Sequence, residues 1–123
     1  EHPSASLMAG VPTATDPAGT APTDGVWFQV TEASDTLTLK VAKNSTATST
    51  NVGTIADDTF VDLAYYYDGV SGIDVYLNGT YVATSVTTNL PDDEELAVFF
   101  AIQNGAAGND YLTVDFVYAA QER

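Results

Sequence analysis

Residues 73–82 read Ile-Asp-Val-Tyr-Leu-Asn-Gly-Thr-Tyr-Val, and this stretch decides the fold. Apolar and polar residues alternate up to Leu77, and a second strand-like run begins at Thr80. Between them, Asn78-Gly79 supplies two residues that tolerate positive φ, which is what a two-residue hairpin turn requires. The stretch therefore predicts two antiparallel strands joined by a tight turn.

The same strand pattern extends through the rest of the chain, and no window shows the apolar stripe of an amphipathic helix. Threonine occurs 17 times, and Val, Ile, Tyr and Phe fill most of the apolar positions, as is typical of β-strands. Alternation marks the ranges 26–32, 36–43 and 112–118. Two further ranges, 60–67 and 96–102, are apolar on both faces, and we expect both strands in the middle of a sheet.

Loops and turns separate these strands at short spacing. Residues 9–25 are rich in Ala, Pro, Gly and Thr and predict a long surface loop, and residues 44–51 a Ser/Thr/Asn linker. Asp68-Gly69 and Asn104-Gly105 indicate further turns. We expect about nine strands in a single domain spanning 1–123, an all-β, antiparallel two-sheet jelly-roll sandwich.

The charge of the chain excludes several functions. Seventeen Asp and Glu residues against three Lys and Arg give a net charge of −14, so we expect no nucleic-acid partner and no binding to an anionic membrane. No apolar run reaches the roughly 18 residues of a membrane span. The absence of cysteine rules out a disulfide framework, a thiolate zinc site and a cysteine nucleophile.

Few residues in the sequence could carry out catalysis. The single histidine is His2, beside the first residue, so neither a Ser-His-Asp triad nor a histidine metal site is predicted. Glycoside hydrolysis needs two carboxyl groups across a cleft, and no Glu-x-Asp or Glu-x-Glu pair lies on an expected strand. Asp62, Asp74 and Asp115 each stand alone, as outward charges or, alternatively, as polar groups lining a ligand groove. We expect no enzyme, no catalytic or metal residue and no cofactor.

Three other patterns each allow a structural and a functional interpretation. The run Asp92-Asp93-Glu94-Glu95 indicates a solvated loop, with calcium binding as the alternative. The two glycosylation sequons, at Asn44 and Asn78, are weak patterns, and the hairpin turn explains the second one. The aromatic residues favour core or cross-strand packing, with sugar stacking as the alternative, and they are Trp27, Tyr65, Tyr66, Tyr67, Tyr76, Tyr81, Tyr111 and Tyr118.

A motif around the hairpin resembles the laminin-G or concanavalin A-like sandwich. Residues 58–69, which end in Asp68-Gly69, are followed by residues 74–79, which end in Asn78-Gly79. That family shows an aromatic residue before a buried strand, an Asp-Gly turn, and a strand ending in Asn-Gly or Asp-Gly. Phe60 stands where the family often has Trp. The resemblance implies the sandwich fold and, by itself, no particular function.

A second resemblance covers most of residues 23–123 and concerns small virion proteins of tailed bacteriophages, which are similar to capsid decoration proteins. It is carried by residues 23–28, 89–91, 102–105 and the closing strand 112–123. It implies a non-enzymatic structural protein on the outer capsid surface of the virion. Its partners would be the major capsid protein and symmetry-related copies of itself. The alternative is a carbohydrate-binding module of a phage fibre or secreted adhesin, which would bind a cell-surface glycan through Trp27 or tyrosines on the concave sheet.

Residues 6–10 resemble the end of a strand already in progress. About nine strands is also few for such a sandwich. We therefore expect the first residues to pair with strands from outside this stretch, from missing N-terminal strands of the same polypeptide or from a neighbouring chain.

Overall fold

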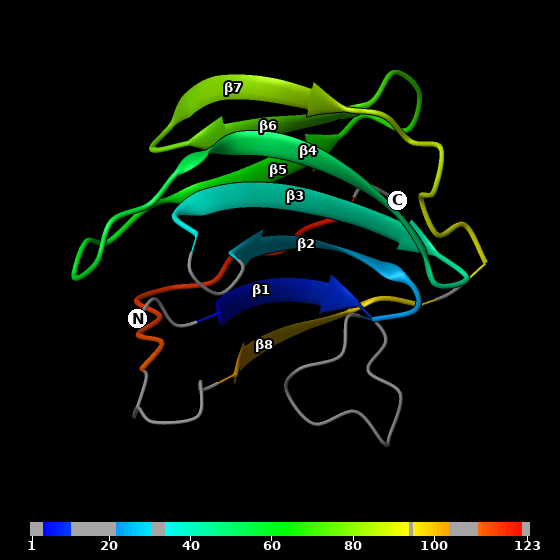
Figure 1. Cartoon of the computed structure of the whole chain (residues 1–123). Helices are drawn as coiled ribbons and strands as arrows, with labels where there is room; N and C mark the ends of the chain where they lie inside the picture. Colours follow the sequence, from blue (N-terminus) through cyan, green and yellow to red (C-terminus); the bar gives the residue numbers. More distant parts are fainter. Residues whose placement is uncertain (1–3, 11–21, 31–33, 94, 104–110, 122–123) are drawn as a thin grey trace.

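The computed structural model describes residues 4–10, 22–30, 34–93, 95–103 and 111–121, and these residues form two antiparallel β-sheets (Figure 1). The five-stranded sheet has the order β4-β3-β2-β1-β8. Its strands are β4 (Thr46–Thr54), β3 (Thr36–Lys43), β2 (Gly25–Val30), β1 (Ser4–Gly10) and β8 (Ala97–Gln103). The three-stranded sheet contains β5 (Leu63–Tyr67), β6 (Ile73–Leu77) and β7 (Thr80–Ser85), in that order. None of the described residues forms a helix that could cross a membrane.

The alternation in the sequence builds one core between the two sheets. On the inner face of the five-stranded sheet the buried side chains come from every second residue of β2 and β3, and Val52 of β4 joins them, while Trp27 and Ala42 form a second buried cluster. In the three-stranded sheet Ile73 and Val75 of β6 face them, both 0% exposed. The core cluster contains Val26, Phe28, Val30, Leu37, Leu39, Val41, Val52, Ile73 and Val75. The antiparallel two-sheet sandwich expected from the sequence is confirmed.

The predicted hairpin is confirmed as β6–β7. Asn78 has φ 51° and Gly79 has φ 73°, the pair of positive angles that a two-residue turn between twisted strands requires. The Asp68-Gly69 turn is confirmed as well, with Gly69 at φ 84°. There the Asp68 carboxylate accepts hydrogen bonds from the backbone N–H groups of Val70 and Ser71, both at 2.8 Å.

The linker expected at residues 44–51 is wrong, because β4 begins at Thr46 and pairs with β3 along its length. The turn between these strands is Asn44-Ser45, with φ 50° and 63°. Residues that precede β2 stabilise this turn. The Asn44 N–H donates a hydrogen bond to the Asp24 carboxylate and the Ser45 N–H donates one to the Thr23 carbonyl, both at 2.8 Å. A Thr-rich strand pairs well on a half-exposed face, although its polarity resembles that of a linker.

The central positions expected for residues 60–67 and 96–102 are also wrong. Both segments lie at sheet edges, β5 in the smaller sheet and β8 in the larger one. Phe60, Tyr66 and Val98 are 72%, 55% and 49% exposed. Apolar side chains on both faces therefore do not indicate a central, buried strand in this chain.

Several expectations concern the ends of the chain. β1 lies between β2 and β8 of the same chain, so the expectation that it pairs with strands from outside is wrong. Of the loop expected at 9–25, Ala9 and Gly10 belong to β1 and Gly25 begins β2, and residues 11–21 lie outside the described part. The strand expected at 112–118 is not formed. Asn104-Gly105 lies outside the described residues, which contain eight strands.

Candidate functional site

The outer face of the three-stranded sheet carries a group of aromatic and polar side chains, which we call the tyrosine face. It consists of Tyr66 on β5, Asp74 and Tyr76 on β6, and Tyr81 and Thr84 on β7. These residues are neighbours across the ladder, because Tyr66 pairs with Asp74, Asp74 with Thr84, and Tyr76 with Tyr81. Asp74 and Tyr76 alternate along β6 with the buried Ile73 and Val75, and therefore point away from the core. Their ladder partners on β5 and β7 point to the same side of the sheet.

A β-bulge brings Tyr81 and Thr84 to the same face. Residues three apart on a regular strand point to opposite faces of the sheet. Here the register shifts between Val75 and Tyr76, because Val75 pairs with Ala83 and Tyr76 with Tyr81, which leaves Val82 as the extra residue. Bulges of this kind re-aim side chains. Both Tyr81 and Thr84 consequently point outward.

A chain of hydrogen bonds connects the polar groups of the tyrosine face. The Tyr81 hydroxyl and Thr84 Oγ1 are 2.7 Å apart, and Thr84 Oγ1 donates to Asp74 Oδ1 at 2.7 Å. The Tyr76 and Tyr81 rings meet edge to face, with centroids 6.0 Å apart and planes at 73°. These contacts fix the orientation of the Tyr81 ring.

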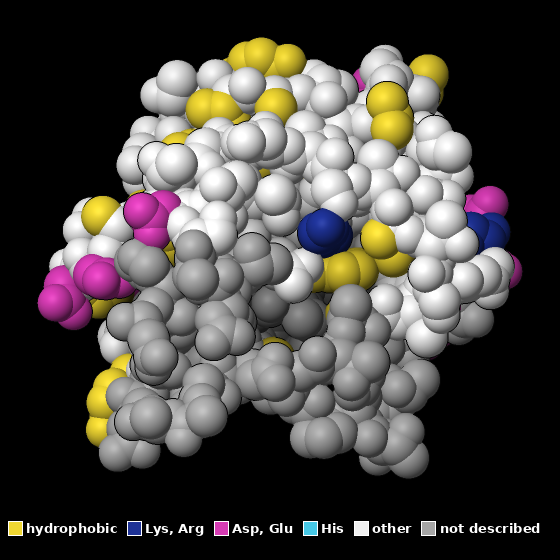
Figure 2. Space-filling model, in the orientation of Figure 1, with side chains coloured by type: hydrophobic (Ala, Val, Ile, Leu, Met, Phe, Trp, Pro, Cys, Tyr) yellow, Lys and Arg dark blue, Asp and Glu magenta, His cyan; other side chains and the backbone are white. Residues whose placement is uncertain are grey.

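The tyrosine face remains accessible to solvent although its polar groups are ordered. Tyr66 and Tyr81 are 55% and 54% exposed, and Asp74 and Tyr76 are partly buried between them. In Figure 2 hydrophobic side chains reach the surface at the top of the molecule, where β7 lies in Figure 1. Exposed aromatic rings beside a carboxylate and a hydroxyl offer both a stacking surface and hydrogen-bonding groups to a ligand.

The other aromatic candidates do not join this face. Trp27 is only 1% exposed, so it offers no surface for stacking, and its Nε1 has no hydrogen-bond partner among the described residues. Tyr65 pairs with the buried Val75, and its ring lies 6.1 Å from that of Phe28 between the two sheets. Burial raises the pKa of the Tyr65 hydroxyl. Tyr111 and Tyr118 lie in the C-terminal segment, more than four-fifths exposed.

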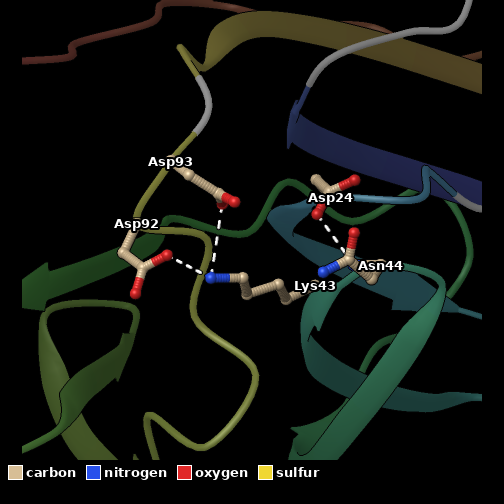
Figure 3. A network of polar contacts seen from close by, with 5 residues as sticks. All are labelled: Asp24, Lys43, Asn44, Asp92 and Asp93. Carbon is tan, nitrogen blue, oxygen red and sulfur yellow. Dashed lines mark hydrogen bonds and ion pairs between the residues drawn. The ribbon is translucent and has the colours of Figure 1, made fainter.

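The acidic loop after Pro91 contacts a lysine (Figure 3). Lys43, the last residue of β3, forms ion pairs with Asp92 and, at 3.3 Å, with Asp93. Asp92 and Asp93 keep 76% and 62% of their side-chain surface exposed, as expected for a solvated loop. The Asp92 hydrogen bond raises the pKa of Lys43, and Lys43 in turn lowers the pKa of Asp92. In this loop the lysine ammonium therefore supplies the counter-charge to both aspartates.

The remaining candidate residues are dispersed. Asp62 is exposed at the start of β5, where its N–H donates to Asn78 Oδ1 at 3.0 Å, and Asp115 is exposed in the C-terminal segment. His2 lies outside the described residues, and the described part holds no group of three or more potential metal ligands. The alternation of residues 73–77 predicts that Asp74 and Tyr76 share one face, which is confirmed, whereas no residue in the sequence indicated the bulge that adds Tyr81.

A comparison with protein families places the chain in a known superfamily. The family model described as the concanavalin A-like lectin/glucanases superfamily, of laminin-G type, matches residues 5–116. No curated protein and no solved structure matches the chain at the threshold applied.

Proposed function

Because the chain belongs to the concanavalin A-like lectin/glucanase superfamily, we propose that it is a non-enzymatic carbohydrate-binding module whose ligand is a neutral glycan. The observation that carries this proposal is the tyrosine face, on which two half-exposed rings flank a hydrogen-bonded carboxylate. The family itself contains both lectins and glucanases, so binding has to be argued from this face.

The side chains of the tyrosine face match the chemistry of a sugar ring. A pyranose presents C–H groups on its flat faces and hydroxyl groups around its edge. The rings of Tyr66 and Tyr81 offer apolar area with little side-chain entropy to lose. The Asp74 carboxylate has acceptor capacity beyond its bond from Thr84, so it can accept a hydrogen bond from a sugar hydroxyl. An open sheet face suits an extended glycan chain better than a single enclosed sugar.

The charge of the protein selects among glycans. With a net charge of −14 and Asp74 on the face itself, a sialylated, sulfated or uronic acid-rich glycan would meet like charge. A neutral oligosaccharide meets no such repulsion.

The number of carboxyl groups on the tyrosine face supports glycan binding without hydrolysis. Glycoside hydrolysis uses two carboxyl groups roughly 5 to 9.5 Å apart. Asp74 is the one carboxylate of the tyrosine face. We therefore expect the glycan to be released unchanged.

Calorimetry with neutral and anionic oligosaccharides tests the proposal. We expect neutral oligosaccharides to bind with a Kd of about 0.1–1 mM, which corresponds to roughly −4 to −5.5 kcal/mol. Tyr66→Ala and Tyr81→Ala should each weaken binding about two- to tenfold, as the loss of one aromatic contact predicts. Tyr111→Ala makes the same change at an exposed tyrosine outside the face and serves as the matched control. Equal weakening by all three variants, or no binding to any neutral glycan, would refute the proposal.

A second candidate is a decoration protein on the outside of a bacteriophage capsid, contacting the major capsid protein and its own symmetry mates. What favours it is the sequence resemblance, together with an acidic surface that free nucleic acid would not bind. Mass spectrometry of purified particles tests it: a copy number near that of the major capsid protein supports decoration. Absence from particles argues against it.

A further inference from the structure

We propose that the edge of β5 that pairs with no other described strand accepts an additional β-strand from a different polypeptide, with apolar residues at alternate positions and Lys or Arg between them. The two sheets differ in size, five strands against three, and β5 ends the smaller one. An edge strand presents unpaired N–H and C=O groups that a further strand can pair with.

The position of the smaller sheet shows why β5, and not β7, is the receiving edge. β6 and β7 pack against β4, which is the end strand of the larger sheet. β5 reaches β2 through the contact of Tyr65 with Phe28. No described strand lies opposite β1 and β8 (Figure 1). A strand added to β5 would therefore cover the larger sheet, whereas one added beyond β7 would cover nothing.

Apolar side chains border the uncovered region from both sheets. Through the register of β1, Val98 and Phe100 of β8 lie on the same face as the buried Val26 and Phe28, yet they are 49% and 38% exposed. In the smaller sheet Tyr67 pairs with the buried Ile73 and is still 39% exposed. Apolar residues at alternate positions of a donated strand would bury these side chains.

The C-terminal segment, residues 111–121, gives the direction of the donated strand. Its residues Leu112, Val114 and Phe116 alternate as in a strand and are exposed, but the segment has no ladder partner among the described residues. In Figure 1 it runs behind the larger sheet in the same direction as β5. Direct pairing with β5 would be parallel, although every strand pair in the structure is antiparallel. A donated strand that runs opposite to β5 would be antiparallel to it, as in every strand pair of the described residues.

Charge identifies the donor as a basic segment and not a second copy of this chain. Asp62 and Asp68 flank β5, and Asp115 lies in the C-terminal segment. The two described cations are already engaged, Lys40 with Ser49 at 2.5 Å and Lys43 with Asp92 and Asp93. Two copies, each at −14, would repel one another at this edge, whereas a basic strand would be attracted.

Fluorescence anisotropy with a labelled synthetic nine-residue peptide of alternating Val and Lys tests the proposal on the full chain. Two matched peptides carry the same charge: one has the same composition with its valines in a block, and one is N-methylated at alternate amides so that it cannot extend a sheet. We expect both to bind at least tenfold more weakly than the alternating peptide. Tyr67→Lys should weaken binding of the alternating peptide by a similar factor, and Val86→Lys, which adds the same charge at an exposed position after β7, should weaken it far less.

Equal binding of the three peptides would show attraction by charge alone and overturn the proposal. Failure of the alternating peptide to bind at millimolar concentration would overturn it too. Light scattering measures the oligomeric state of the protein. A dimer that Tyr67→Lys converts to a monomer would assign this edge to a second copy of the chain, against the proposal. The two surfaces adjoin at β5, which carries Tyr66, but none of the peptide experiments uses a glycan, so glycan binding can fail without affecting any of these results.

Discussion

Thr84 connects the two functional groups of the tyrosine face, since its hydroxyl contacts both the Tyr81 hydroxyl and the Asp74 carboxylate. Thr84 therefore contributes to glycan binding by positioning the Tyr81 ring and the Asp74 carboxylate. Thr84→Val keeps the shape of the side chain and removes both hydrogen bonds. We expect glycan binding to weaken several-fold, while the free energy of unfolding changes by about 1 kcal/mol or less, because the site is exposed. Calorimetry and thermal unfolding measure the two effects, with Thr80→Val on the same strand as control. A weakened glycan affinity in Thr80→Val as well would argue against a specific role of Thr84.

A second residue-scale prediction concerns the turn at Asp68. Its bonds from the N–H groups of Ser71 and Val70 lower the pKa of the carboxyl group in the folded state. A lowered folded-state pKa means that the carboxylate stabilises the fold above its unfolded pKa, near 3.9, and that this stabilisation disappears as the pH falls through the folded value. Asp68→Asn keeps an acceptor oxygen but cannot titrate.

The stability difference between wild type and Asp68→Asn, followed by urea unfolding from pH 7 to pH 2, should therefore favour wild type near neutrality and shrink below pH 4. A difference that stays constant over this range would mean that the charge of Asp68 plays no part in the turn.

At the scale of elements, the hairpin β6–β7 depends on two glycines in different ways. Gly79 has φ 73° and open space around its missing Cβ, so Gly79→Ala should cost only backbone strain, about 1–2 kcal/mol. At Gly72 a Cβ would lie 2.6 Å from Thr84 Cγ2 and 3.0 Å from the Ser85 carbonyl oxygen. Gly72→Ala should therefore displace Thr84 and weaken glycan binding, whereas Gly79→Ala should leave glycan affinity unchanged. Equal glycan affinity of the two variants would contradict this coupling.

The hairpin was predictable because Asn78-Gly79 encodes its turn locally, and the alternation of β2, β3 and β6 encodes which side chains form the core. Strand position was not predictable in the same way. Residues 60–67 and 96–102 are apolar on both faces but lie at edges, since the position of a strand depends on which distant segments pair beside it in the same sheet. β4 was missed because its Ser and Thr residues resemble a linker, although Asn44 at the turn was a usable signal. Within the candidate site, the alternation of β6 indicated the outward positions of Asp74 and Tyr76, whereas no residue in the sequence indicated the bulge at Val82.

For the molecule as a whole, the two sheets share one core. Leu39 of the larger sheet and Ile73 of the smaller sheet are both 0% exposed and belong to the same cluster. Leu39→Ala and Ile73→Ala should each destabilise the protein by about 2–5 kcal/mol. Both should shift the same single calorimetric transition. Separate transitions, with each variant moving only one of them, would show that the sheets unfold independently.

The central claim is that a neutral glycan lies on the tyrosine face, and NMR titration of the ¹⁵N-labelled protein with a neutral oligosaccharide tests it most directly. The account predicts that the largest amide shift changes cluster on β5–β7 around Tyr66, Asp74 and Tyr81, and that in Tyr81→Ala the same cluster titrates with an affinity about two- to tenfold weaker. Shift changes confined to the larger sheet or to the acidic loop after Pro91, with β5–β7 unaffected, would contradict it.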